Sequence, residues 1–199
     1  VLVMDGERYP VTLRVPGMHN IYNSLSAVAV ATAFGMKMDE ISSGLKKFTG
    51  GDMRLHIVEV KENRNIKVID DTYNASPDSI HAALKILQGM DGQRKIAILG
   101  DMMELGEYSR NAHRQVGEWA ATYGVDMLIT KGRDSTWIGE GAVEAGMPDQ
   151  FVCHMQNNEE VIEWLKKSLI DGDRILVKGS RAMQMEEITE FMMNGGFYK

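Results

Sequence analysis

From residue 54 onward, short aliphatic runs alternate with longer helical patterns. The runs lie at 54–60, 66–70, 95–99, 126–130, 151–153 and 174–177, and helical spacing separates most of them. Strands that alternate with helices of this length favour an α/β fold, in which a mainly parallel sheet is covered by helices on both faces. We therefore expect one α/β domain over residues 52–199.

Residues 1–51 have a different pattern. Apolar and polar residues alternate over 1–15, which predicts a hairpin of half-buried strands. An Ala-rich stretch at 20–34 predicts a buried helix, and Asp39 is expected to cap a shorter helix that ends near Phe48. The Gly50-Gly51 pair marks a hinge, so we place a domain boundary between 51 and 52.

Composition narrows the classes of partner. A net charge of −6 argues against nucleic acid as the main partner, because phosphate binding needs clustered Lys and Arg. No apolar run reaches the roughly 18 residues of a membrane-spanning helix, so we expect no membrane insertion. Cys153 is the only cysteine of the 199 residues, which suits a reducing compartment such as the cytoplasm.

Polar residues follow the run at 66–70. Asp70, Asp71, Tyr73 and Asn74 stand where a predicted strand ends, and ligands of α/β sheets gather at strand ends. The two carboxylates can accept hydrogen bonds from ribose hydroxyls or hold a cation. Alternatively, they are structural and accept backbone N–H groups at the end of the strand.

Two further candidates precede this strand end. Arg54 follows the predicted hinge, where a guanidinium can clamp phosphate oxygens, although a surface salt bridge is an equal alternative. Asn20 and Asn23 are spaced to share one helix face, and an Asn amide can pair with the N6/N7 edge of adenine. The alternative is that Asn20 caps the helix.

Two more polar loops follow predicted strands. Asp101 and Glu104 form an acidic loop that can attract an ammonium group, or they belong to an ordinary connecting loop. Lys178, Ser180 and Arg181 lie between a strand and a helix, where cations and backbone N–H groups make a carboxylate or phosphate site. The alternative is a capped helix with two solvated cations.

Glycines and missing motifs add two expectations. Gly100 and Gly179, which begin these loops, are expected to let the backbone approach a ligand closely. The sequence contains no G-x-x-x-x-G-K-[ST] phosphate loop and no zinc-ligand spacing. A nucleotide bound to this chain would therefore lack its usual phosphate cradle here.

His113 lies on the helix predicted after the acidic loop at 101–104, and we expect it to be packed and not catalytic.

Five segments in order resemble the Mur ligase family. They are Gly17–Ala27 (GMHNIYNSLSA), Met53–Leu55 (MRL), Asp70–Ser79 (DDTYNASPDS), Gly100–Gly106 (GDMMELG) and Val177–Arg181 (VKGSR). Each motif is weak by itself, but the ordered set covers nearly the whole chain. The resemblance is strongest to members that join D-alanyl-D-alanine to UDP-N-acetylmuramoyl-tripeptide.

The resemblance implies a domain assignment. Mur ligases have a UDP-substrate domain, a central ATPase domain and a C-terminal Rossmann-like domain. Residues 1–51 would be the end of the central domain, and residues 52–199 the whole C-terminal domain. The phosphate loop and the residues that bind Mg²⁺ would then lie upstream, which explains their absence from a fragment that is inactive alone.

The resemblance also implies a reaction and residue roles. ATP phosphorylates the tripeptide carboxylate, and the amine of D-alanyl-D-alanine attacks the acyl phosphate during peptidoglycan precursor synthesis. Asn20 and Asn23 would contact adenine, Arg54 the nucleotide, and Asp71 or Asp70 the ribose, with Tyr73 and Asn74 beside them. From charge alone, the loops at 101–104 and 178–181 would receive the dipeptide. A folylpolyglutamate synthetase and a non-catalytic nucleotide- or peptide-binding module remain alternatives.

Overall fold

The computed structural model describes residues 1–51, 53–60 and 65–195. The chain divides into two compact units, Val1–Gly51 and Asp52–Lys199. The interpretation of the first unit as the end of an ATPase domain stays a prediction.

The first unit begins with a short antiparallel hairpin. Strand β1 (Leu2–Met4) pairs with β2 (Glu7–Tyr9) across a two-residue turn at Asp5 and Gly6. Both turn residues have positive φ values, 51° and 82°, as a tight hairpin turn of this twist requires. The hairpin is shorter than the predicted 1–15, because the backbone at residues 10–15 has no strand partner.

Two helices complete the first unit. Helix α1 (Met18–Ala33) ends before Gly35, whose φ of 78° suits the residue that follows a helix. Helix α2 (Met38–Lys47) begins one residue before Asp39, so the prediction that Asp39 is the cap is wrong. Instead, the Glu40 carboxylate accepts the backbone N–H of Lys37 at 3.0 Å.

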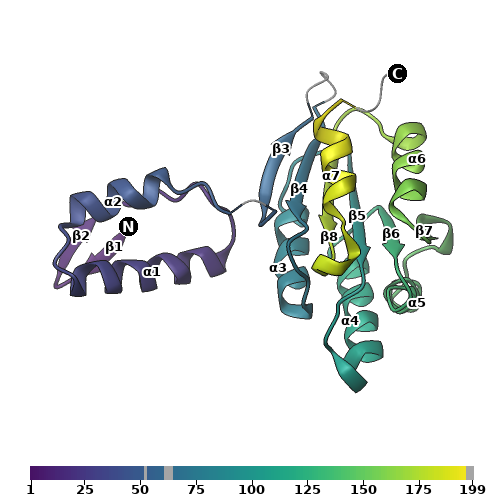
Figure 1. Cartoon of the computed structure of the whole chain (residues 1–199), viewed down its shortest axis with the longest axis horizontal. Helices are drawn as coiled ribbons and strands as arrows, with labels where there is room; N and C mark the ends of the chain where they lie inside the picture. Colours follow the sequence, from purple (N-terminus) through teal and green to yellow (C-terminus); the bar gives the residue numbers. More distant parts are fainter. Residues whose placement is uncertain (52, 61–64, 196–199) are drawn as a thin grey trace. The chain divides into compact units, whose positions relative to one another are not determined.

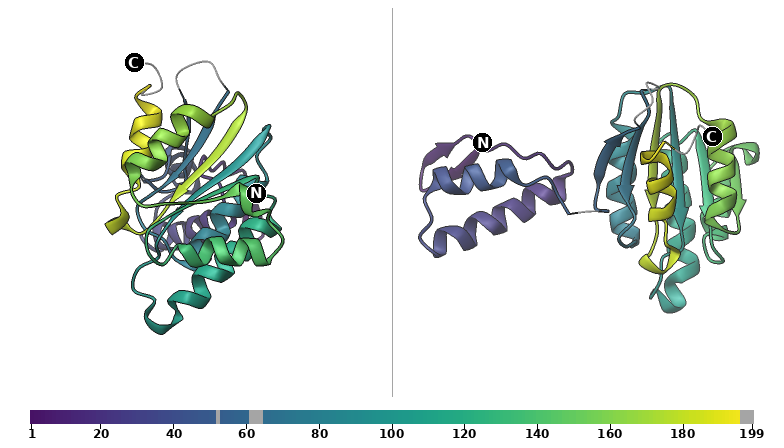
Figure 2. Two further views of the ribbon diagram at one scale, coloured as in Figure 1. Left: turned by 90° about the vertical axis from the view of Figure 1, so that its right-hand side faces the viewer. Right: turned by 45° about the horizontal axis from the view of Figure 1, so that its top comes forward.

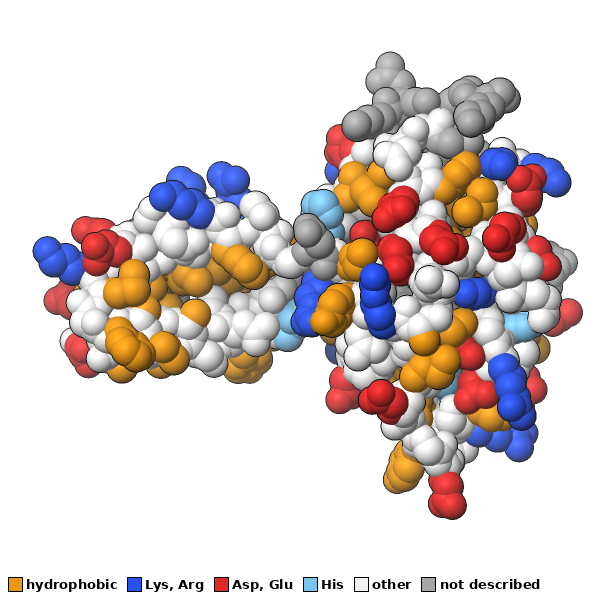
Figure 3. Space-filling model, viewed as in Figure 1, with side chains coloured by type: hydrophobic (Ala, Val, Ile, Leu, Met, Phe, Trp, Pro, Cys, Tyr) orange, Lys and Arg blue, Asp and Glu red, His pale blue; other side chains and the backbone are white. Residues whose placement is uncertain are grey.

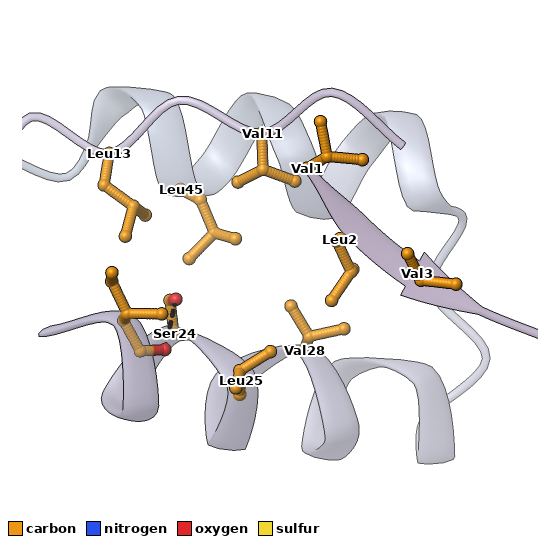
Figure 4. Close-up of a pocket in the computed structure, with 10 residues that line it drawn as sticks. Val1, Leu2, Val3, Val11, Leu13, Ser24, Leu25, Val28 and Leu45 are labelled. Carbon is orange, nitrogen blue, oxygen red and sulfur yellow. Dashed lines mark hydrogen bonds between the residues drawn. The ribbon is translucent and has the colours of Figure 1, made fainter. Parts of the chain in front are cut away.

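The first unit buries little of its apolar surface. Val28 and Ile41 are its buried apolar side chains, whereas Tyr22, Val30 and Phe34 are exposed. Hydrophobic side chains are visible on the surface of this unit in Figure 3. Between the hairpin and the helices lies an apolar cavity of about 370 Å³ (Figure 4). Its lining consists of Val1, Leu2, Val3, Val11, Leu13, Ile21, Ser24, Leu25, Val28 and Leu45.

The described part of the second unit forms a sheet of six strands in the order β3-β4-β8-β5-β6-β7 (Figure 1). Their bounds are β3 His56–Glu59, β4 Lys67–Asp71, β5 Arg94–Gly100, β6 Met127–Lys131, β7 Val152–Met155 and β8 Asp173–Lys178. Strand β3 is antiparallel to β4, and the other neighbours are parallel. The predicted Rossmann-like fold is therefore confirmed.

Helices cover both faces of this sheet (Figure 2). Helices α3 (Pro77–Gln88), α4 (Ser109–Thr122) and α5 (Thr136–Glu144) share one apolar core with the sheet. Helices α6 (Asn158–Ser168) and α7 (Glu186–Met193) share another core on the opposite face. The strands themselves are aliphatic on both faces, as expected for a parallel sheet between two helical layers.

The strand order decides where the loops emerge. Strand β8 comes last in the chain but lies between β4 and β5, so Lys178 pairs in register with both Asp71 and Leu99. Because β4, β8 and β5 are parallel, the loops that follow them leave the same edge of the sheet side by side. The three polar loops singled out in the sequence therefore meet at one rim.

Candidate functional site

A buried ion pair joins β4 to β8 at this rim. The Lys178 ammonium lies 2.6 Å from a carboxylate oxygen of Asp71, and the two side chains are 2% and 11% exposed. Lys178 Nζ also donates to the backbone carbonyl of Asn74 at 2.8 Å. Burial lowers the pKa of Lys178, whereas the charge of Asp71 raises it. Lys178, predicted from sequence to meet the substrate, is thus directed into the protein.

The backbone around Arg54 is held by the same carboxylate. Leu55 N donates to Asp71 Oδ1 at 3.1 Å, and Tyr73 N donates to the carbonyl of Met53 at 3.1 Å. Met53 and Leu55 have positive φ values of 59° and 47°, a conformation that is costly for non-glycine residues. The guanidinium carbon of Arg54 stacks 4.2 Å from the centroid of the Tyr73 ring. Arg54 and Tyr73 are both exposed at the rim.

Asp70 has different partners from its neighbour Asp71, because successive side chains of a strand point to opposite faces. The Asp70 carboxylate accepts Thr72 Oγ1 at 2.7 Å and Thr72 N at 3.3 Å. Burial raises the pKa of Asp70, and the hydrogen bonds from Thr72 oppose that rise. Asp70 is therefore a structural carboxylate in this geometry, and Asp71 is the one beside Arg54.

Replacement of Asp70 by asparagine tests this role. A carboxyl whose pKa is raised in the folded state favours folding below its unfolded pKa and loses that contribution as the pH rises through its folded pKa. We expect wild type to lose more stability than Asp70→Asn between pH 4 and pH 7. Urea unfolding across this range measures the difference, and parallel pH profiles would contradict the prediction.

The loop after β4 leads directly into a capped helix. Asn74 Oδ1 accepts the backbone N–H of Ala75 at 2.9 Å, while the Asn74 side chain stays exposed. Ser76 then caps α3 by accepting the N–H of Ser79 at 3.4 Å, with Pro77 in the first turn. This local chemistry fixes the path of the loop between Tyr73 and α3.

Hydrogen bonds join the acidic loop, residues 101–104, to the basic loop, residues 178–181. Ser180 N donates to the carbonyl of Asp101 at 3.0 Å, and Met103 N donates to Ser180 Oγ at 2.8 Å. The Asp101 carboxylate is buried and accepts Ser135 N at 2.7 Å, at the start of α5. Glu104, in contrast, is exposed on the loop with a φ of 65°. Of the two predicted acidic residues, Glu104 is the one accessible to a ligand.

Gly100 and Gly179 permit this close approach. A Cβ atom on Gly179 would lie 3.3 Å from the Cα of Gly100 and 2.8 Å from a side-chain carbon of Met185. Because Gly100 and Gly179 have no side chains, the ends of β5 and β8 can pack against each other and against Met185. The sequence predicts a close approach of this backbone to a ligand, whereas the two glycines approach each other and Met185.

Arg181 is the exposed cation of the basic loop. Its side chain is 56% exposed, and it lies 2.9 Å from a carboxylate oxygen of Glu186 at the start of α7. Arg181 Nη1 also lies 3.1 Å from the sulfur of Met53. Met53 belongs to residues 53–55, which we call the Arg54 turn. Arg181 and Arg54 thus provide positive charge at the same rim.

The sequence predicts that His113 is packed, and the residue is fully buried; it assigns no role to Lys131. His113 Nε2 accepts Met102 N at 3.0 Å, and its Nδ1 lies 2.7 Å from the carbonyl of Ser109. It supports the acidic loop from α4. Lys131, at the end of β6, donates to the carbonyl of Met183. A Lys-Gly pair ends two aliphatic runs of the sequence, at Lys131-Gly132 and at Lys178-Gly179. This repeated pair is the signal that could have identified Lys131.

In the first unit, the Asn20 side chain contacts the backbone before its helix. Gly17 is the N-cap of α1, so the alternative in which Asn20 caps the helix is wrong. Asn20 Nδ2 donates to the carbonyl of Pro16 at 2.7 Å, and Asn23 Nδ2 lies 3.4 Å from Asn20 Oδ1. The two amides share one helix face, and Asn23 is exposed.

The part of the chain that the structure describes lacks two kinds of feature. Within residues 1–51, 53–60 and 65–195, no three His, Cys, Asp or Glu side chains are grouped so that they could hold a metal ion. No helix in that part of the chain has the length and apolar character needed to cross a membrane.

Comparisons with known proteins agree on one family. The family model described as "Mur ligase, glutamate ligase domain" matches residues 53–181. UDP-N-acetylmuramoyl-tripeptide–D-alanyl-D-alanine ligase of Escherichia coli is 35% identical over 94% of this chain, and that of Bacillus subtilis is 33% identical over 87%. The chain spans 39% and 38% of these relatives, about two fifths of their length.

Solved structures give the same result. A MurF structure from Acinetobacter baumannii superposes with a TM-score of 0.81 and 30% identity, covering 92% of this chain and 40% of that protein. The MurF ligase from Thermotoga maritima in complex with ADP has a TM-score of 0.76 over 92% of this chain and 39% of its own. At 24% identity, this second likeness supports the fold alone.

Proposed function

The chain belongs to the Mur ligase family, and on that premise we propose that it is the C-terminal part of the ligase that joins D-alanyl-D-alanine to UDP-N-acetylmuramoyl-tripeptide. Residues 1–51 would be the end of the ATPase domain and residues 52–199 the C-terminal domain. The curated relatives named above carry this activity in their names, which supports the choice of substrates.

The proposed reaction needs an activated carboxylate and a nucleophilic amine. ATP would supply the phosphoryl group that turns the tripeptide carboxylate into an acyl phosphate, and the dipeptide amine would displace phosphate to form the peptide bond. The described residues group no metal ligands, so Mg²⁺ would be held elsewhere in the ligase. The proposed compartment is the cytoplasm, in keeping with a single cysteine, Cys153.

The Arg54 turn is the proposed nucleotide contact of the second unit. Arg54 is exposed, carries a fixed positive charge and is oriented by the Tyr73 ring. A guanidinium held in this way can bind phosphate oxygens in a bidentate geometry. Asp71 and Asn74 lie beside the turn, and Asp71 is the proposed ribose contact. Asn20 and Asn23 of the first unit remain the predicted adenine contacts.

The joined loops after β5 and β8 are the proposed dipeptide site. Glu104 would attract the dipeptide ammonium, and Arg181 would bind its carboxylate together with backbone N–H groups of the basic loop. Asp101 and Ser180 hold these two loops at a fixed separation. The arrangement matches the two opposite charges of a dipeptide, which supports this side of the rim as its binding site.

One observation carries the proposal: loops after β4, β8 and β5 leave the sheet at a single rim. Arg54 and Tyr73 lie near the first loop, Arg181 on the second and Glu104 on the third. Ligands of open α/β sheets bind outside the carboxyl ends of the strands, where the strand order reverses. Both reactants could therefore meet at one edge.

The test is phosphate release by the intact ligase that contains this chain. We expect release that depends on ATP, UDP-N-acetylmuramoyl-tripeptide and D-alanyl-D-alanine together. Arg54→Ala should lower kcat/KM for ATP about 10- to 100-fold, the size expected when a charge-assisted hydrogen bond is lost. Arg114→Ala is the matched control, because Arg114 forms surface ion pairs between α4 and α5. Equal activity of wild type and Arg54→Ala would refute the role of Arg54.

The same assay separates the alternatives. Turnover with glutamate in place of D-alanyl-D-alanine would favour a folylpolyglutamate synthetase. A folylpolyglutamate synthase of Mycobacterium tuberculosis shares the fold with a TM-score of 0.64, but at 17% identity this likeness carries no substrate information. Absence of turnover with either amine would favour a non-catalytic binding module.

A further inference from the structure

The Arg54 turn has an energetically unfavourable backbone conformation. Its flanking residues, Met53 and Leu55, both have left-handed φ values. Such residues persist only where neighbouring structure holds them. Here the holding bonds come from β4 and the loop after it, because Tyr73 N donates to Met53 O and Asp71 Oδ1 accepts Leu55 N. The pose of Arg54 therefore depends on the orientation of the Asp71 carboxylate.

Lys178 is the group that orients this carboxylate. Its ammonium lies 2.6 Å from Asp71 Oδ2, which leaves Oδ1 directed at Leu55 N. A second bond from Lys178 Nζ to the carbonyl of Asn74 holds the loop after Tyr73, on whose ring Arg54 stacks. Lys178 is 2% exposed, so its ammonium is bound by protein groups on the inner side of the rim.

We propose that Lys178 is a positioning residue: it fixes Asp71 and the Asn74 loop, and through them it sets the Arg54 turn and the Arg54–Tyr73 stack. This assignment replaces direct substrate contact by Lys178 and leaves Arg181 as the accessible cation of the loop. The structural part concerns this chain alone. The effect on catalysis rests on the proposed ligase function, so the two parts are tested separately.

The chain offers a matched control for general destabilisation. Arg94 and Asp173 form a second ion pair on the neighbouring strands β5 and β8, with Arg94 Nη2 2.7 Å from Asp173 Oδ2. Asp173 is fully buried, and Lys178 is almost fully buried, so each pair includes a buried charge. This pair lies at the opposite ends of the strands, since Arg94 and Asp173 are the first residues of β5 and β8. Arg94→Met thus breaks a comparable pair far from the Arg54 turn.

Hydrogen exchange tests the structural part on the 199-residue chain. In Lys178→Met we expect the Leu55 amide to exchange about 10- to 100-fold faster, relative to amides of β6, because its charged acceptor is no longer held. Arg94→Met should leave that ratio unchanged. An unchanged ratio in Lys178→Met would overturn the proposal. If Lys178→Met does not fold, Asp71→Asn/Lys178→Met is compared with Asp71→Asn, because the two variants share the same acceptor for Leu55 N and differ only at Lys178. Faster Leu55 exchange in the double variant would support the proposal, and an equal ratio would overturn it.

Kinetics of the intact ligase test the catalytic part. A misplaced Arg54 should raise KM for ATP about tenfold in Lys178→Met and change kcat less, while Arg94→Met keeps the wild-type KM. A wild-type KM in Lys178→Met would overturn the link from Lys178 to nucleotide binding. Failure of the proposed function looks different, because the wild-type ligase would then show no turnover while the exchange result still decides the structural part.

Discussion

Asp71→Asn is expected to lower the free energy of unfolding of the second unit by about 3–5 kcal/mol at pH 7. The substitution keeps the size of the side chain and an acceptor for Leu55 N, but it leaves the Lys178 ammonium buried without a counter-ion. Breaking one partner of a buried pair is costly because the remaining charge can neither reach water nor find a new partner.

The three tryptophans provide the measurement. Trp119, Trp137 and Trp164 all lie in the second unit, so their fluorescence during urea unfolding reports that unit. Loss of the Asp71 charge lowers the pKa of Lys178 further, and a lysine whose folded pKa is depressed costs less stability as the pH rises toward its unfolded value of about 10.4. The difference from wild type should therefore shrink between pH 7 and pH 10.

The double variant Asp71→Asn/Lys178→Met is the control for this explanation. It removes both charges, so it should recover a large part of the stability lost in Asp71→Asn. If the double variant were as unstable as the sum of the two single variants, the unpaired charge would not be the cause. A pH-independent loss in Asp71→Asn would contradict it as well.

Gly117→Ala is expected to have the second large effect. It should lower the free energy of unfolding by about 3 kcal/mol and the Tm by about 6–12 °C. In an open helix the same change would stabilise by about 1 kcal/mol. Here α4 packs against α5 backbone to backbone, and a Cβ on Gly117 would overlap the carbonyl of Ile138 and lie 2.6 Å from the backbone nitrogen of Ala142. Backbone atoms inside a helix cannot move aside as a flexible side chain can.

Gly89→Ala is the matched control for Gly117→Ala. Gly89 ends α3 with a φ of −76°, and a Cβ there would meet its nearest atoms at 3.6 and 3.7 Å, which is ordinary contact. We expect this variant to stay within about 0.5 kcal/mol of wild type. Thermal unfolding followed by tryptophan fluorescence compares the two. Equal Tm values for Gly117→Ala and Gly89→Ala would contradict the close packing of α4 on α5.

Several features of the fold were predictable because they depend on local pattern. Aliphatic runs bounded by turns located the strands of the sheet, and the Ser76-Pro77 pair located the start of α3. The hairpin was overextended, since alternation continues through residues 10–15 without a partner strand. Residue type predicts Asp39 as a cap, although Lys37 occupies that position and Glu40 supplies the bond.

By itself, the sequence determined that polar loops would follow strands of a parallel sheet. Parallel strands end at a common rim, so strand positions alone place Asp71, Gly100 and Lys178 on one edge of the sheet. Only the tertiary structure decided which polar side chains turn inward. Lys178 reaches Asp71 across 107 positions of sequence, because the last strand inserts between β4 and β5. Such long-range register leaves no periodic signal in a single sequence, and it decides whether a charge meets a ligand or holds the protein together.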